Sequence, residues 1–200
     1  MFKPAILLRA LAPLVLFGAA TPAFAHPDHG ALLLSVPAAF AHGLAHPLFG
    51  LDHLAAMLAV GVWAAQLGGR ARLAVPASFV VLMLVGALAA LLGFTPPAIE
   101  SGIAASLIVL GLASAAALRV PVSAAALLVG SFALFHGAAH GAELPNGAAP
   151  AAYIAGFALM TTLLHAAGLA LARALHGRGA FALRVGSGLT AAAGCALVWL

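Results

Sequence analysis

The sequence predicts an all-α fold, a polytopic membrane bundle of about six transmembrane helices that follows an N-terminal signal peptide. Of its 200 residues, 65% are hydrophobic and only 6% are charged, whereas a soluble domain carries about 25% charged residues. Several apolar runs approach the ~20 residues that a membrane helix needs. Because helices satisfy their own backbone polar groups without closing into a barrel, we expect these runs to be α-helical.

Residues 1–25 have the pattern of a secretory signal peptide. Lys3 and Arg9 supply the positive start, ALAPLVLFGAA is a short apolar core, and AFA at residues 23–25 is a small-x-small cleavage pattern. Cleavage would leave His26 as the first residue. An uncleaved first helix is the alternative, and in both cases residue 26 lies outside the cytoplasm.

The remainder, residues 26–200, is expected to form a single transmembrane domain. Its apolar runs predict spans at roughly 48–68, 73–93, 101–118, 120–141, 150–172 and 180–200. Residues 31–45, ALLLSVPAAFAHGLA, are too short to span a bilayer and contain Pro37. We interpret them as an interfacial or re-entrant segment.

The distribution of charge supports this topology. With residue 26 outside, all the basic residues of the mature chain fall in inner connections: Arg70, Arg72, Arg119, Arg173, Arg178 and Arg184. Asp28, Glu100 and Glu143 fall in outer segments. This agrees with the positive-inside rule. We therefore expect a multi-pass protein of the bacterial inner membrane, with the mature N-terminus and the C-terminus both on the outer, periplasmic side.

Composition excludes several classes of function. Signal cleavage would leave no lysine, so a Walker A phosphate loop is impossible and we expect no ATP hydrolysis by that route. There is no basic patch of the kind that binds nucleic acid. A single cysteine, Cys195, allows no disulfide within the chain.

Two polar motifs interrupt the apolar sequence. The first, HPLFGLDHLAAM, begins at His46 and opens the first span from the outer side, with Pro47 at an early helical position and Asp52 and His53 one to two turns further in. An ionisable residue at membrane depth is a functional-site hypothesis by default. A helix cap, or a histidine bonded to a neighbouring carbonyl, is the alternative for either residue alone.

The second motif is FHGAAHGAELP at residues 135–145. His136 and His140 are four residues apart and therefore lie on one helical face, and Glu143 follows within a turn. Gly137 and Gly141 would let a neighbouring helix approach closely. The fourth span runs outward, so both motifs reach the same membrane level. Imidazole and carboxylate groups together are a donor set for a divalent transition metal.

Other residues are secondary candidates for a metal path. His42 lies four residues before His46, and His26 and His29 could capture metal near the mature N-terminus. His165 lies in the fifth span, roughly 22 Å from its outer end, and could be a relay or a buried structural histidine. Glu100 could complete an acidic vestibule or mark a membrane boundary. His176 lies in a basic loop and is expected to be solvated.

The stretches HPLFGLDHLAAMLAVGVWAAQLGGRA and FALFHGAAHGAELP resemble the HupE/UreJ family of hydrogenase and urease accessory membrane proteins. The resemblance covers nearly the whole mature chain. It implies a nickel permease, with cobalt as a companion ion, whose metal residues are His46, Asp52, His53, His136, His140 and Glu143. In the larger nickel–cobalt transporter family the histidine precedes the Asp-His pair by one residue fewer, so that family is not the match.

From this resemblance we expect a protein that is not an enzyme, with no permanently bound cofactor and with membrane lipid and a divalent metal ion as partners. Whether it forms a homo-oligomer stays open. The residues alone also allow a metal-binding accessory or receptor subunit without transport, a haem-binding cytochrome, or a membrane metalloenzyme such as a di-iron oxygenase. No HExxH sequence occurs, which removes the common zinc-protease pattern.

Overall fold

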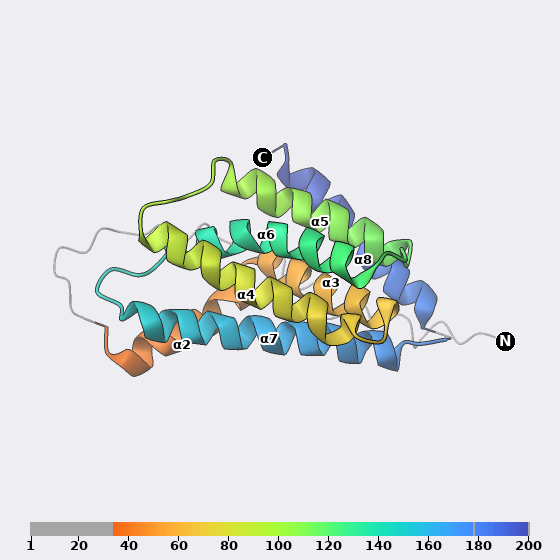
Figure 1. Ribbon diagram of the computed structural model, residues 1–200, viewed down its shortest axis with the longest axis horizontal. Helices are drawn as coiled ribbons and strands as arrows, with labels where there is room; N and C mark the ends of the chain where they lie inside the picture. Colours follow the sequence, from red (N-terminus) through yellow and green to blue (C-terminus); the bar gives the residue numbers. More distant parts are fainter. Residues whose placement is uncertain (1–33, 178, 200) are drawn as a thin grey trace. The chain divides into compact units, whose positions relative to one another are not determined.

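The computed structural model describes residues 34–177 and 179–199, which form a bundle of antiparallel helices without strands (Figure 1). The expected signal peptide, His26, Asp28, His29 and Arg178 lie outside the described residues. The helices are α2 (Val36–Phe49), α3 (Leu51–Leu67), α4 (Ala71–Leu91), α5 (Ile99–Ala115), α6 (Val122–Ala142), α7 (Pro150–Ala174) and α8 (Ala180–Leu197). The expectation of an all-α polytopic bundle is confirmed.

Helix α3 is the centre of this bundle. It packs against each of the other described helices, and residues 59–64 are all buried, with Trp63 fully enclosed. A helix that is apolar on every side belongs in a core. The side chains at the start of α3 are therefore held in the middle of the assembly.

The chain bends by 81° between α2 and α3. Pro47 lies in the last turn of α2, and α3 begins at Leu51 after an extended Gly50. The prediction that Pro47 stands early in the first span is therefore wrong. Proline has no N–H to donate within a helix, and α2 ends within one turn after it. Asp52 and His53 consequently lie in the first turn of α3, not one to two turns further along.

The expected spans all coincide with helices, but their lengths differ. Helices α4, α6, α7 and α8 are each long and apolar enough to cross a membrane, and the bent pair α2–α3 would make a fifth span. Helix α5 has 17 residues, which is ~26 Å of helix against a hydrocarbon core of ~30 Å. The segment expected to be interfacial or re-entrant, residues 31–45, overlaps α2, and the bend fits a re-entrant segment or a broken span.

Charged side chains separate to the two ends of the bundle. Arg72, Arg119, Arg173 and Arg184 line one cavity of about 710 Å³ at the end where α3, α5 and α7 finish. Glu100 lies in the first turn of α5 and Glu143 caps the C-terminus of α6, both at the opposite end. The predicted segregation is therefore present in the fold, and the assignment of the arginine end to the cytoplasm stays a prediction.

Glycine allows the closest helix contact, between α4 and α6. A Cβ atom at Gly137 would collide with the backbone carbonyl of Met83, and one at Gly141 would lie 2.6 Å from the carbonyl oxygen of Ala87. The prediction that these glycines let a neighbouring helix approach closely is confirmed. The contact matters for the site because it lies on the same turns of α6 as His136 and His140.

We expect Gly137→Ala to destabilise the protein by about 1–3 kcal/mol, because α4 and α6 must move apart to admit the methyl group. Gly186→Ala in α8 is the matched control, since nothing lies within 4 Å of a Cβ atom there. That change should be neutral or stabilise the helix by up to about 1 kcal/mol. Thermal unfolding in detergent followed by circular dichroism measures both, and equal melting temperatures for the two variants would contradict the packing argument.

Candidate metal site

Four imidazole rings from three helices meet at the glutamate end of the bundle. His46 comes from the last turn of α2, His53 from the first turn of α3, and His136 and His140 from the last turns of α6. Ring centroids lie 4.9 Å apart for His46 and His140, 4.7 Å for His53 and His140, and 4.8 Å for His53 and His136. The two sequence motifs thus form one cluster.

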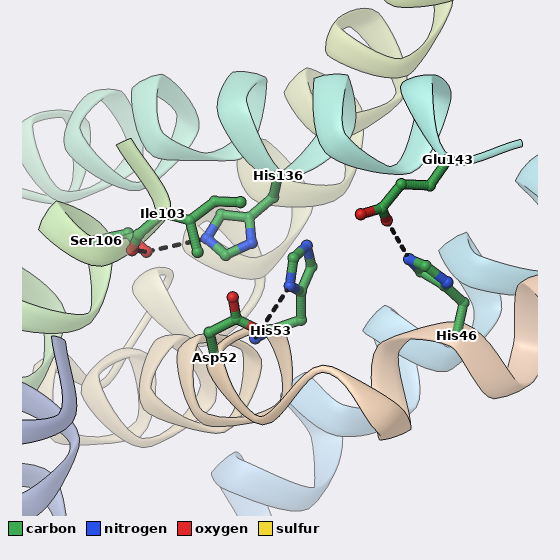
Figure 2. A network of polar contacts seen from close by, with 7 residues as sticks. All are labelled: His46, Asp52, His53, Ile103, Ser106, His136 and Glu143. Carbon is green, nitrogen blue, oxygen red and sulfur yellow. Dashed lines mark hydrogen bonds and ion pairs between the residues drawn. The ribbon is translucent and has the colours of Figure 1, made fainter. Parts of the chain in front are cut away.

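The outer part of this cluster contains a carboxylate. Nε2 of His46 lies 2.8 Å from an oxygen of Glu143, and both side chains are partly exposed (Figure 2). One ligand atom each from His46, His140 and Glu143 lies within 4.8 Å of the others. Atoms bound to the same metal ion at ~2.1 Å lie at most about 4.2 Å apart. Small side-chain rotations would therefore bring these three groups around one ion.

Asp52 orients His53 instead of reaching that group. Its Oδ1 accepts a hydrogen bond from the backbone N–H of His53 at 2.7 Å and lies 2.9 Å from the ring Nδ1 (Figure 2). A carboxylate only accepts hydrogen bonds, so Nδ1 carries the proton and Nε2 keeps its lone pair. A carboxylate behind a histidine fixes the ring and increases its basicity as a metal ligand.

Ser106 on α5 orients His136 as Asp52 orients His53. This serine was not among the residues expected from the sequence. Its Oγ lies 2.6 Å from the carbonyl oxygen of Ile103 and 2.9 Å from Nε2 of His136 (Figure 2). A hydroxyl has one proton, which goes to Ile103. Nε2 of His136 therefore donates to Oγ, and Nδ1 keeps its lone pair. A serine 30 residues away in sequence, without periodicity to mark it, gives no signal in a single sequence.

The free lone pairs are buried. His53 Nε2, His136 Nδ1 and both ring nitrogens of His140 have no hydrogen-bond partner within the described residues. Burying such atoms without partners costs free energy. Neutral imidazole nitrogens of this kind are ligands for divalent transition metals, so the residues present fit a metal ion.

Two aromatic side chains of α7 cover this cluster, and neither was predicted. The ring of Phe157 stacks on His140 at 4.7 Å, and Tyr153 lies edge-on to His46 at 5.9 Å. Both are buried. They keep the imidazoles packed on the side of α7, so the partly exposed His46 and Glu143 form the open side.

The secondary candidates do not join the cluster. His42 and Glu100 are exposed on α2 and α5. His165 is buried in α7 without contact to the four clustered rings, and His176 is exposed beside the arginines. His26 and His29 lie outside the described residues. The six residues that the resemblance implied as metal ligands all lie at the glutamate end of the bundle. Asp52 contacts the imidazole cluster only through His53.

Comparison with known proteins places most of the chain in one group. Residues 14–197 match the family described as HupE / UreJ protein. Protein HupE of Rhizobium leguminosarum bv. viciae is 44% identical over 157 residues, which cover 78% of this chain and 82% of that protein. No solved structure shows a significant match.

We expect Ser106→Ala to weaken Ni²⁺ binding 10- to 100-fold, the usual effect of losing a partner behind a metal-binding histidine. Isothermal titration of the purified protein in detergent measures this. Ser131→Ala is the matched control, because Ser131 also donates to the carbonyl three residues earlier, Leu128, but is exposed. Equal affinities in the two variants would show that the hydroxyl of Ser106 does not determine which ring nitrogen of His136 is free to bind metal.

Proposed function

The chain belongs to the HupE/UreJ family, and we propose that it is a membrane permease that takes up nickel(II), with cobalt(II) as an alternative ion, to supply the maturation of a nickel enzyme. The family is one of hydrogenase and urease accessory membrane proteins and not of enzymes. The observation that carries the proposal is the convergence of four imidazoles and Glu143 at one end of a membrane bundle.

The donor set supports a divalent ion of intermediate softness. Neutral imidazole nitrogens and a carboxylate suit nickel, cobalt and zinc, whereas copper(I) prefers thiolate or thioether ligands. The only cysteine, Cys195, is exposed on α8 and takes no part in the cluster. Selectivity among these ions would depend on the coordination geometry of the site and on which ion is available in the cell. The order of affinities alone would favour copper(II).

Entry would begin at Glu143 and His46, which are the exposed members of the cluster. There the ion would exchange part of its hydration shell for carboxylate and imidazole ligands. The next rings, His140 and His136, are completely buried. Because transport requires binding that is favourable yet reversible, a chain of imidazoles is better suited than a closed site of several carboxylates.

The charge distribution supports inward transport. If the arginine end faces the cytoplasm, as the positive-inside rule requires, the metal cluster faces outward and the ion moves inward. A potential of 100 mV, negative inside, contributes about 2.3 kcal/mol for each charge, or about 4.6 kcal/mol for a divalent ion. Uptake against a modest gradient would therefore need no ATP.

We expect Asp52→Asn and His53→Ala each to reduce nickel uptake at least tenfold in proteoliposomes that hold the purified protein under an imposed potential. The first change removes the charge that orients His53, and the second removes the ligand itself. His176→Ala is the control, because that residue is exposed at the arginine end, and it should transport like the unaltered protein.

Cobalt and zinc as competitors in the same assay would define the ion that is carried. Accumulation that is lost in both site variants would support the permease. Binding of nickel by the unaltered protein without accumulation would contradict transport and favour a metal-binding accessory subunit of the same family.

A further inference from the structure

The cavity at the arginine end is lined by guanidinium groups from four separate parts of the chain. Its volume is about 710 Å³, which is in the range of small-ligand pockets. Arg72 comes from the first turn of α4 and Arg119 from the connection between α5 and α6. Arg173 comes from the last turn of α7 and Arg184 from α8. Segments far apart in the sequence therefore place positive charge around one cavity.

These charges have no acidic partner within the described residues. The two ion pairs found there both join a histidine to a carboxylate of the metal site. Glu100, the remaining acid of the described ranges, lies in the first turn of α5 at the opposite end. Like charges around one cavity repel one another, and an anion among them removes that repulsion. The charge distribution at this end therefore favours an anion from outside the chain.

The wall of the cavity on the side of α5 is fixed by two of the side chains that line it. Nε of Arg184 donates to the carbonyl oxygen of Ala115 at 2.7 Å, and Nε2 of Gln66 donates to that of Ser114 at 3.0 Å. Both carbonyls belong to the last turn of α5, where regular helical partners run out. The bond from Arg184 uses only one of the several N–H donors of a guanidinium, so the other donors are held at a defined place.

The position of the cavity favours a membrane lipid over a soluble anion. The cavity lies where α3 and α7 end and where α4 and α8 begin, at the boundary between the apolar spans and their connections. Leu67, Leu175 and Leu183 line it together with the arginines, and Phe181 on the first turn of α8 is 77% exposed. Basic pockets between membrane helices bind the headgroups of anionic lipids.

We propose that this cavity binds the phosphate headgroup of an anionic phospholipid through Arg72, Arg119, Arg173 and Arg184. A guanidinium can donate two parallel N–H bonds to the oxygens of one phosphate, which a lysine cannot do. The leucine side chains of the cavity would contact the glycerol and the first methylene groups of the acyl chains. The inference concerns the arginine end alone and does not depend on which metal the opposite end binds.

General attraction of basic connections to an anionic membrane surface is the competing explanation, because the positive-inside rule places arginines at one end in any case. Arg70 separates the two explanations. It precedes Arg72 by two residues, is exposed at the N-terminus of α4, and does not line the cavity. A surface effect would depend on both arginines equally, whereas a site would depend on Arg72.

The test is a titration of the purified, delipidated protein in an uncharged detergent with phosphatidylglycerol, followed by native mass spectrometry. Phosphatidylethanolamine with the same acyl chains, whose headgroup has no net charge, is the lipid control. We expect one phosphatidylglycerol to bind at least tenfold more tightly than phosphatidylethanolamine. Arg72→Gln and Arg173→Gln should each weaken that binding about tenfold, because each removes hydrogen bonds to a charged group. Arg70→Gln should leave it unchanged.

Equal affinity for the two lipids, or equal weakening by Arg70→Gln and Arg72→Gln, would overturn the site and favour general attraction to the membrane surface. Arg173→Gln gives the same comparison with Arg70→Gln if Arg72→Gln does not fold. Inorganic phosphate added as a competitor distinguishes the source of the anion. We expect it to displace phosphatidylglycerol only in large excess, because it lacks the apolar part. Displacement at equimolar phosphate would overturn the assignment to a lipid and indicate a site for a soluble anion.

Discussion

The cost of placing unpaired imidazole nitrogens in an apolar interior is the constraint on which this structure depends. His136 and His140 are completely buried, and three of their four ring nitrogens have no partner within the described residues. Such atoms are unfavourable unless a ligand compensates for their desolvation. The surrounding bundle must therefore be stable enough to hold them, and the histidines are packed on aromatic rings and, at His136, fixed by Ser106.

That stability comes from helices that meet at backbone distance. Gly137 and Gly141 bring α4 against the turns of α6 that carry the histidines, and Gly61 and Gly168 do the same for α3 and α7. In lipid no hydrophobic effect drives helices together, so close van der Waals contact takes its place. Gly137 and Gly141 lie on the same turns of α6 as His136 and His140, and this gives the clustered imidazoles a rigid backbone at the cost of very little volume.

The sequence predicted those parts of the site whose residue types are rare in an apolar chain. It also predicted which end of the bundle they share, because that follows from the number of membrane crossings. Histidine and carboxylate side chains are conspicuous in an apolar chain, and counting crossings brings two distant motifs to one end. The bend at Gly50 was missed because Pro47 is compatible with either the start or the end of a helix. Ser106 is a common residue in an apolar helix, and only the packing of α5 on α6 gives it a partner in His136.

The spacing of the rings makes the four imidazoles one continuous row. From His46 through His140 and His53 to His136, successive ring centroids are at most 4.9 Å apart. Under the proposed transport function, neighbouring rings at this spacing would let an ion exchange one imidazole for the next. Reversible transport would then depend on binding at each ring that is weak enough to release the ion.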